Sequence, residues 1–366
     1  MDVPVALDAT LWDEPTTGIG QYTRCLASAL TAAQVPLLRL GAKVSGEHPR
    51  TQRSATLFTL GELPGLLRRL HAPLYHAHGN FNLPLARSAT RTVVTVHDLI
   101  PLLLPDTVSR AFRLQFRIWL GHTLEIADQV ICVSEVTRRA LLDRFALPPE
   151  RVHVVHNGVD HVAAHPLDDE ARALLASLHL PARYVLFAGA LDVRKNVSVV
   201  LDACEALHRA GRSVPLVLAG QRWFGSGPVE SRLAALRAAG VPLHPVGFQP
   251  AKVLYALMAH ADAFVFPSRY EGFGLPPLEA MWSGTPAVVS NQGALPEVCG
   301  PSAIQVHPDD GEGLAQAMAR LTRDPAERRH RAEAGQAWAR RFTWARAAKE
   351  TAEVYARALA SGVTRF

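Results

Sequence analysis

Short apolar runs alternate with longer helical stretches along nearly the whole chain. Runs with the length and composition of strands lie at residues 3–7, 36–40, 73–78, 92–97, 129–133, 151–156, 184–189, 214–219, 263–267, 286–290 and 303–307. Helical periodicity fills most of the gaps, and between Ile19 and Ala33 it places Tyr22, Leu26 and Leu30 on one face. This alternation predicts an α/β protein with parallel sheets covered by helices on both faces.

A polar segment interrupts this pattern in the middle of the chain. After His156-Asn-Gly-Val-Asp160 come the acidic residues Asp168, Asp169 and Glu170, and a fresh series of strands then starts at residues 184–189. The length of 366 residues exceeds what one hydrophobic core usually needs. We therefore predict two Rossmann-like doubly wound domains, at residues 1–165 and 166–343.

The last stretch of the chain, residues 344–366, predicts a helix. Trp344, Ala348, Tyr355 and Leu359 recur in it at roughly helical spacing. A helix with such an apolar face is expected to pack against another surface of the protein.

Composition narrows the classes of protein. Hydrophobic residues make up 48% and charged residues 19%, which is ordinary for a globular protein. The net charge of +5 comes without a Lys/Arg block, so we expect no nucleic-acid partner. No apolar run is long enough to span a membrane, and nothing before residue 3 resembles a signal peptide. Four widely spaced cysteines without a CxxC pair suit reduced thiols in the cytoplasm.

Two basic stretches leave a surface role open. They read RAFRLQFRIW at residues 110–119 and LPGLLRRL at residues 63–70. A solvated helix face is one interpretation, and affinity for an anionic substrate or for the inner face of a membrane, by peripheral contact, is the other.

The most informative strand exit reads FVFPSRYEGFGLPPLEAMWSGTPAVVSN, at residues 264–291. In doubly wound sheets, ligands bind beyond the carboxyl ends of the strands. Glu271 lies on the loop and Glu279 on the following helix, so both carboxylates are expected at one crevice. The backbone amides of Gly274 and Leu275 lie at a helix N-terminus, which favours a phosphate or a sugar hydroxyl. Ordinary surface acids are the alternative.

A second strand exit, GALDVRKN at residues 189–196, carries two neighbouring cations. Arg194 and Lys195 precede a helix that is predicted to begin near Asn196. Two cations beside a helix N-terminus can neutralise a diphosphate and stabilise its departure as a leaving group. An exposed basic turn is the alternative.

Two further strand exits carry weaker patterns. His97 and Asp98 end a buried strand, where such a pair orients a substrate hydroxyl or forms a structural hydrogen bond. Gly18 and Gly20 start a helix after the first strand, but the third glycine and the later acidic residue of a dinucleotide site are missing. A nicotinamide enzyme is therefore disfavoured.

The sequence predicts no metal site. Asp-x-Asp, the usual device for holding a divalent cation on a nucleotide sugar, does not occur. His76 with His78, and His153 with His156, lack the cysteines or carboxylates that would complete a ligand set, so we interpret them as structural.

These segments together resemble glycosyltransferase family 4, a group of retaining enzymes with the two-domain GT-B architecture. The matching segments occur in the family's order: TGIGQYT, VTVHDLIPL, ICVSEVTRRAL, VVHNGVD, GALDVRKN, the stretch from residue 264 to 291, LPEVCG and FTWARAAKETAEVY. The resemblance implies two Rossmann-like domains that face each other across a cleft. It also implies that the C-terminal helix crosses back onto the first domain.

The resemblance implies a role for each catalytic candidate. Glu271 would contact the hydroxyls of the donor sugar, and Glu279 would hold the nucleotide ribose. Arg194 and Lys195 would bind the diphosphate. His97 would lie over the donor sugar near the acceptor.

A further set of residues would line the donor. Gly18 and Gly20 would lie on the phosphate and acceptor side. The remaining members are Gly189, Val246, Phe273, Gly274 and Leu275, with the donor base expected near the loop at residues 246–248.

The subgroup that this chain resembles most transfers mannose from GDP-mannose during O-antigen or exopolysaccharide assembly. The resemblance implies a metal-independent, retaining hexosyltransferase with no cofactor beyond a GDP- or UDP-linked sugar, and a glycan or lipid-linked acceptor. Thr10 and Ala190 depart from the family's usual residues, arginine at the first position and arginine or serine at the second. A sugar-nucleotide epimerase, a phosphorylase and a non-catalytic two-domain sugar-binding protein are the alternatives.

Overall fold

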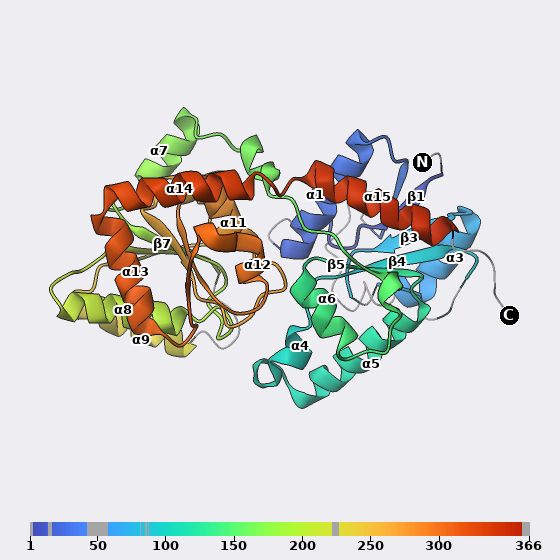
Figure 1. Cartoon of the computed structure of the whole chain (residues 1–366), viewed down its shortest axis with the longest axis horizontal. Helices are drawn as coiled ribbons and strands as arrows, with labels where there is room; N and C mark the ends of the chain where they lie inside the picture. Colours follow the sequence, from blue (N-terminus) through green and yellow to red (C-terminus); the bar gives the residue numbers. More distant parts are fainter. Residues whose placement is uncertain are drawn as a thin grey trace. The chain divides into compact units, whose positions relative to one another are not determined.

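The protein is described by a computed structural model, which covers residues 3–13, 17–41, 58–80, 82–84, 86, 88–221 and 227–360. The chain forms two compact units (Figure 1). Unit 1 combines residues 1–158 with residues 343–366, and unit 2 comprises residues 159–342. Within the described residues, no helix is long and apolar enough to cross a membrane.

Unit 1 is built on a six-stranded parallel sheet. Its strands are β1 (Val5–Asp8), β2 (Leu37–Leu40), β3 (Leu74–Ala77), β4 (Arg91–Val96), β5 (Gln129–Cys132) and β6 (Val152–Val154), in the order β2-β1-β3-β4-β5-β6. The strand order reverses between β1 and β3, because β1 leads to β2 on one side and β3 leads to β4 on the other. Such a reversal is where doubly wound sheets bind ligands.

Helices cover both faces of this sheet. They are α1 (Gly18–Ala32), α3 (Leu63–Arg69), α4 (Ile100–Leu103), α5 (Arg110–Ile126), α6 (Glu135–Leu142) and α15 (Trp344–Ala360), with short helical turns at Phe58–Glu62, Pro105–Thr107 and Pro149–Arg151. Ala6 packs with α3 and α5, whereas its neighbour Leu7 packs with α1 and α15. This alternation follows from the period of two in a strand.

The C-terminal helix α15 belongs to the core of unit 1. It buries the apolar face that the sequence predicts, including Trp344, Ala348 and Tyr355, against α1 and the sheet. Leu359 is half-buried at the same surface. Residues 361–366, which the predicted segment also includes, lie outside the described residues.

Unit 2 contains the second six-stranded parallel sheet. Its strands are β7 (Val185–Ala188), β8 (Leu216–Ala219), β9 (Leu243–Gly247), β10 (Ala263–Phe266), β11 (Ala287–Ser290) and β12 (Ile304–Val306), in the order β12-β11-β10-β7-β8-β9. Counted within the unit, this is the strand order of dinucleotide-binding sheets. The reversal lies between β7 and β10, so the loops that leave these two neighbouring strands are the expected place for a ligand.

The helices of unit 2 join these strands and close the unit. They are η4 (Asp160–Ala164), α7 (Asp169–Ser177), α8 (Val197–Arg209), α9 (Gly227–Ala238), α10 (Ala251–His260), α11 (Leu275–Trp282), α12 (Leu295–Cys299), η5 (Gly300–Ser302), α13 (Gly311–Arg323) and α14 (Pro325–Ala339). Both sheets together confirm the predicted α/β class with two Rossmann-like units.

Strand β9 is absent from the sequence-based prediction. It is the edge strand beyond β8, contains Pro245, and buries only Leu243 among its residues. An edge strand with one buried side chain has no apolar run to reveal it. Val246, predicted to lie in a loop, is therefore part of this strand.

The division between the units falls at Gly158, seven residues before the predicted boundary at residue 165. The backbone N–H of Val159 donates to the carbonyl of Phe342 at 3.0 Å. His161 contacts Glu279, which also lies in unit 2. These contacts tie residues 159–165 to unit 2, although no polar segment marks that point in the sequence.

Candidate active site

The loops after β7 and β10 meet at the switch point of the second sheet. Arg194 Nη1 lies 2.7 Å from Glu271 Oε1, and Lys195 Nζ lies 2.8 Å from the same oxygen. Ser268 donates a third hydrogen bond to that oxygen, at 2.5 Å. The two predicted cations and the predicted donor carboxylate thus form one cluster.

Backbone and side-chain hydrogen bonds hold the two loops in this arrangement. The N–H of Arg269 donates to the carbonyl of Arg194 at 2.8 Å. Asp192 Oδ1 accepts from the N–H of Lys195 at 2.7 Å. Asn196 has a left-handed backbone at the start of α8, and its side chain donates to the carbonyl of Pro267 at 3.2 Å. The loop after β7 is therefore fixed to the loop after β10.

The cluster is buried and charged. Glu271 is only 8% exposed. Burial alone would raise the pKa of Glu271, but Lys195 and Arg194 outweigh it and lower that pKa to about 2. Burial also lowers the pKa of Lys195, and Glu271 counteracts it. The Lys195 ammonium lies 4.5 Å above the ring of Phe266, which adds a cation–π contact. The carboxylate is therefore ionised at neutral pH.

Three glycines keep the backbone close around this cluster. A Cβ at Gly220 would lie 1.9 Å from the carbonyl oxygen of Gly189. A Cβ at Gly293 would lie 2.8 Å from the backbone N and O of Glu271, where the φ of Gly293 is +62°. Gly189, with φ of +154°, was predicted from the sequence, whereas Gly220 and Gly293 were not. In the sequence, Gly220 and Gly293 are recognisable only as glycines that follow a strand, and such glycines are too common to identify a site.

The N-terminus of α11 offers few backbone donors. Pro276 and Pro277 follow Leu275 and have no N–H, so Gly274 and Leu275 carry the free amides of the first turn. Gly274 has a φ of +102°, and a Cβ there would meet the side chain of Leu295 at 2.5 Å. Phe273 is buried, with its ring 6.1 Å from that of Phe342. The backbone N–H groups of Gly274 and Leu275 thus lie at the helix N-terminus, as the sequence predicts. Phe273 is part of the core, and its contact with the donor sugar stays a prediction.

Glu279 is a buried residue rather than a surface acid. It is 7% exposed, and its Oε1 lies 2.9 Å from Nε2 of His161. The hydroxyl of Tyr255 donates to the same oxygen at 3.4 Å. His161 and Tyr255 were not predicted, because neither sequence distance nor any motif links them to Glu279. The alternative of two ordinary surface acids is wrong for both glutamates.

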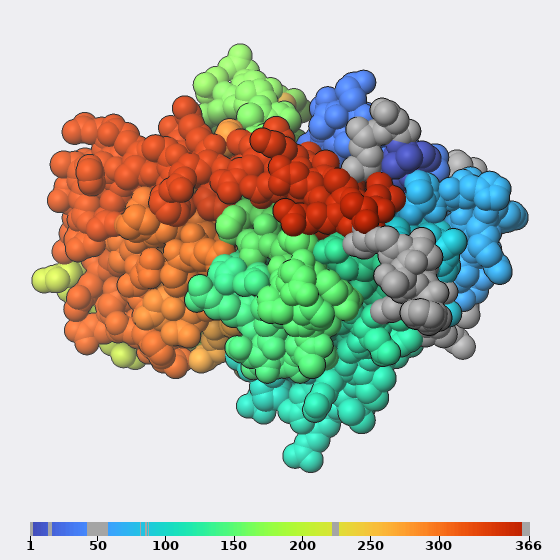
Figure 2. Space-filling model, turned by 45° about the vertical axis from the view of Figure 1, so that its right-hand side comes forward, coloured from blue at the N-terminus to red at the C-terminus, as the bar shows by residue number. Residues whose placement is uncertain are grey.

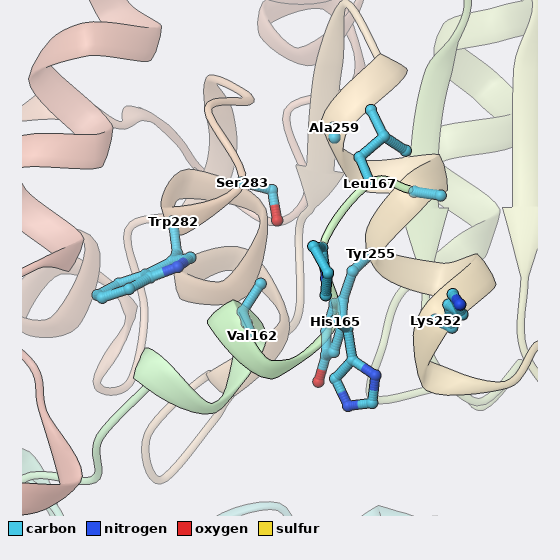
Figure 3. A pocket seen from close by; sticks show the side chains of 10 residues that line it. Val162, His165, Leu167, Lys252, Tyr255, Ala259, Trp282 and Ser283 are labelled. Atoms are coloured by element: carbon cyan, nitrogen blue, oxygen red, sulfur yellow. The ribbon is translucent and has the colours of Figure 1, made fainter. Parts of the chain in front are cut away.

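A pocket of about 180 Å³, which Tyr255 also lines, lies within unit 2. Figure 3 shows Val162 and His165, which precede α7, opposite the residues of α10 and the end of α11. The lining includes Tyr255 and Trp282 and is mainly apolar, and Ser283 donates to the carbonyl of Glu279. The pocket is not at the strand exits, so it is not the expected donor site.

Val246 does not join the cluster. It lies on β9, and β8 separates that strand from β7. Its carbonyl accepts a hydrogen bond from the side chain of Gln249 at 2.6 Å. A contact between Val246 and a donor base stays a prediction.

The predicted residues of unit 1 lie at the exits of β1 and β4. His97 follows β4, and its Nε2 lies 2.8 Å from the carbonyl oxygen of His78. Because a carbonyl only accepts, Nε2 carries the proton and Nδ1 is the acceptor in the neutral ring. Burial lowers the pKa of His97 to about 4. His97 is therefore a neutral hydrogen-bonding group at pH 7.

Gly18 and Gly20 open α1. Thr17 caps this helix, and its Oγ1 accepts from the N–H of Gly20 at 3.0 Å. The amide of Gly20 is therefore already satisfied. Among the described residues, no atom lies within 4 Å of a Cβ built at Gly18.

Behind His97 lies a buried network that the sequence did not predict as a unit. His76 Nδ1 lies 2.7 Å from the hydroxyl of Tyr355, and its Nε2 lies 2.8 Å from Oγ1 of Thr95. The hydroxyl of Tyr22 lies 2.9 Å from the same Thr95 oxygen, and its ring stands edge-on to His97 with 4.8 Å between centroids. The network joins α1, β3, β4 and α15.

The switch point of unit 1 also carries a buried carboxylate, as that of unit 2 does. Asp8 ends β1 and is buried, and its two oxygens accept from the side chains of Thr10 and Asn82, each at 2.5 Å. Burial raises the pKa of Asp8, against these hydrogen bonds. In the sequence, Thr10 stands out only as a departure from the family's usual arginine. Thr10 in this structure supports Asp8.

Within the described residues, no group of three or more histidines, cysteines or acids is placed to hold a metal ion. His76 and His78 are buried with ring centroids 4.5 Å apart, and both have hydrogen-bond partners on other elements. Burial lowers the pKa values of both rings below the ordinary value, that of His78 to about 3. These are structural histidines, as predicted.

The strand order of both sheets and the polar groups at their switch points place this protein in the doubly wound α/β class, whose members bind ligands where the strand order reverses. A family model described as Glycosyltransferase Family 4 matches residues 17–162, and one described as Glycosyl transferases group 1 matches residues 177–338. The chain therefore belongs to the family 4 glycosyltransferases, and it is an enzyme that transfers glycosyl groups.

Individual relatives agree with this assignment. The O-antigen chain mannosyltransferase B of Escherichia coli is 29% identical over 93% of this chain and 96% of its own length. The alpha-maltose-1-phosphate synthase of Mycolicibacterium smegmatis is 33% identical over 72% of each chain. The structure of sucrose-phosphate synthase from Thermosynechococcus elongatus has a TM-score of 0.76, with 23% identity over 98% of this chain and 100% of that one. These similarities give no support to the epimerase or to the non-catalytic sugar-binding alternative.

Proposed function

We propose that this enzyme transfers mannose from GDP-mannose, with retention of configuration and without a metal ion, to a glycan or a lipid-linked acceptor. The observation that carries the proposal is the cluster of Arg194, Lys195 and Glu271 at the switch point of the second sheet. The similarity to an O-antigen chain mannosyltransferase over nearly the full length of both chains supports mannose as the sugar.

The cluster suits a reaction in which a nucleoside diphosphate leaves. Arg194 and Lys195 supply two positive charges beside the N-terminus of α8. Three and four residues after Glu271, the backbone N–H groups of Gly274 and Leu275 supply hydrogen-bond donors. Preorganised charge of this kind stabilises the negative charge that develops on the diphosphate. Glu271 balances the two cations before the donor binds and accepts hydrogen bonds from the sugar hydroxyls afterwards.

In the proposed reaction, the bond between the anomeric carbon and the diphosphate oxygen breaks, and its electron pair leaves with GDP. The acceptor hydroxyl oxygen forms the new bond to the same face of that carbon. The departing diphosphate takes up the proton of the hydroxyl. His97, neutral at pH 7, accepts a hydrogen bond from the sugar through Nδ1 and does not serve as the base.

Glu279 is proposed to bind the ribose. Its carboxylate is oriented by His161 and Tyr255, so it is presented in one geometry. We further propose that the enzyme works in the cytoplasm, because the buried cysteines Cys132, Cys204 and Cys299 are free thiols, as in a reducing compartment.

A nucleotide panel tests the donor. We expect GDP to raise the melting temperature of the protein more than UDP or ADP, because a ligand at 100 times its Kd adds about 2.7 kcal/mol to stability. GDP-mannose should be consumed in the presence of EDTA, with the α-linked product identified by NMR. Stabilisation by UDP or ADP alone would contradict the GDP assignment. Loss of turnover in EDTA that Mg²⁺ restores would contradict metal independence.

A further inference from the structure

Helix α5 exposes an apolar face that the core of unit 1 does not use. Its inward side chains Phe116 and Leu120 are buried. Leu114 and Ile118 are each 60% exposed, and Phe112 is 40% exposed. Since successive residues of a helix turn by roughly 100°, Leu114 and Ile118 form a stripe nearly opposite the buried residues. In Figure 2, the teal segment that contains α5 projects from the lower edge of unit 1.

Arginines flank this stripe on one side. Arg110, Arg113 and Arg117 recur at spacings of three and four, so they share one edge of the helix. The helix has no acidic residue before Glu125. Within the described residues, no carboxylate pairs with these three guanidinium groups. The exposed apolar stripe is therefore bordered by uncompensated positive charge.

Aromatic side chains do not border the stripe. Phe112 and the half-buried Trp119 lie roughly 100° or more around the helix from Leu114 and Ile118, next to the buried face. An exposed apolar stripe that is bordered by arginines is typical of helices that lie in the interface of a membrane, where the guanidinium groups reach phosphates.

A second copy of the chain fits this surface less well. The three exposed apolar side chains offer roughly 300 Å², well below the ~800 Å² that each partner contributes to a stable interface. Two such faces meeting symmetrically would also bring six like charges together. A negatively charged surface complements the arginines instead.

We propose that the outward face of α5, made of Leu114, Ile118 and the arginines 110, 113 and 117, binds the surface of an anionic phospholipid bilayer. The apolar side chains enter the boundary between headgroups and acyl chains, and the guanidinium groups contact lipid phosphates. The helix follows the strand exit of His97 through α4, with which it packs. The proposal does not depend on the identity of the donor.

Vesicle flotation with the full chain tests this surface. One set of vesicles contains phosphatidylcholine alone, and the other contains equal parts of phosphatidylcholine and phosphatidylglycerol. We expect binding to the second set only, weakened by salt. The double variant Leu114→Ser/Ile118→Ser and the double variant Arg110→Glu/Arg117→Glu should each reduce partitioning at least roughly tenfold.

Matched controls come from α7, which also carries an exposed leucine and an exposed arginine. Leu174→Ser and Arg172→Glu should leave vesicle binding unchanged. All variants should keep the melting temperature, because the altered side chains are exposed, and consumption of the donor in solution reports separately on the proposed function.

Three results would overturn the proposal. The first is an absence of vesicle binding by the unaltered chain. The second is equal loss of binding in the α7 controls. The third is a dimer in analytical ultracentrifugation that the Leu114→Ser/Ile118→Ser variant abolishes, because it would assign this face to a second copy of the chain.

Discussion

The ammonium of Lys195 and the carboxylate of Glu271 lie 2.8 Å apart although 76 residues separate them in the sequence. They meet because β7 and β10 are neighbours at the reversal of strand order in the second sheet. Arg194 contacts the same carboxylate oxygen, so two cations share one acid. A bound diphosphate would balance the excess positive charge, which makes the pair a sensitive point for testing the site.

Replacing Lys195 should reduce turnover without unfolding the protein. Lys195→Ala removes one of the two cations that face the leaving diphosphate, and losses of roughly 100-fold in kcat are typical for one such group. Lys195→Arg should recover part of the rate. Lys252→Ala is the control, because Lys252 pairs with surface acids on α7 in the same unit. Unchanged turnover in Lys195→Ala would refute the assignment.

Acid should destabilise the protein partly through Glu271. Its pKa is about 2 in the folded chain against an ordinary value of 4.5, so its stabilising contribution is present above pH 4.5 and lost as the pH falls towards 2. The shift corresponds to roughly 3 kcal/mol. Calorimetry from pH 7 to pH 3 should show that the stability gap between the unaltered chain and Glu271→Gln narrows on acidification. The gap for the surface variant Glu170→Gln should change much less.

His161 should act on donor affinity through Glu279. His161→Phe removes a hydrogen bond from a buried carboxylate, so we expect KM for the donor to rise roughly tenfold while kcat changes little. His161→Gln should restore much of the affinity, because it keeps a donor. Calorimetric titration with GDP and 2′-deoxy-GDP is the specific readout. If the preference for GDP persists undiminished in His161→Phe, the residue does not position a ribose-binding group.

Substitution of Gly18 distinguishes a role of this residue in substrate binding from a role in folding. A Cβ at this position meets no atom of the described residues within 4 Å, so Gly18→Ala should keep or slightly raise the melting temperature. If a substrate passes close to the backbone there, turnover should fall at least roughly tenfold. Gly227→Ala is the matched control, since Gly227 also begins a helix and a Cβ there likewise meets no described atom within 4 Å. Full activity in Gly18→Ala would place the substrate elsewhere.

Tyr355 should stabilise the attachment of α15 through His76. Tyr355→Phe leaves Nδ1 of a buried histidine without its partner, which costs about 1–3 kcal/mol. Urea unfolding measures this loss. The double variant Tyr355→Phe/His76→Phe should cost less than the sum of the single variants, because they share one interaction. Strict additivity would show that the hydrogen bond contributes nothing to stability.

Much of the fold follows from the sequence pattern. Central parallel strands are buried on both faces, so runs such as residues 184–188 and 263–267 are continuous in apolar residues and easy to recognise. Edge strand β9 is covered on few sides and tolerates Pro245, so it has no such run. The predicted boundary at residue 165 differs from the observed one at Gly158 for a similar reason. The hydrogen bond of Val159 is made by its backbone, so the residue type does not reveal it.

The candidate site was predicted in part. Arg194, Lys195, Glu271 and Glu279 lie in segments whose composition and order resemble a family, so they could be named. His161 and Tyr255 could not, because each contributes one hydrogen bond to Glu279 and belongs to no motif. Ser268 lies within the matching stretch, but nothing in its residue type shows that it donates to Glu271. Only the distances between these side chains and the two glutamates in the folded chain assign them to the site.

The sequence by itself determined which segments become strands and helices, and which polar residues follow them, because periodicity and glycine or proline placement act locally. Only the tertiary structure decided that Lys195 and Arg194 share the oxygen of Glu271, and that His161 orients Glu279. It also decided that α5 leaves Leu114 and Ile118 outside the core. The physical reason is that pairing between distant residues depends on strand order and helix packing, which no local pattern encodes.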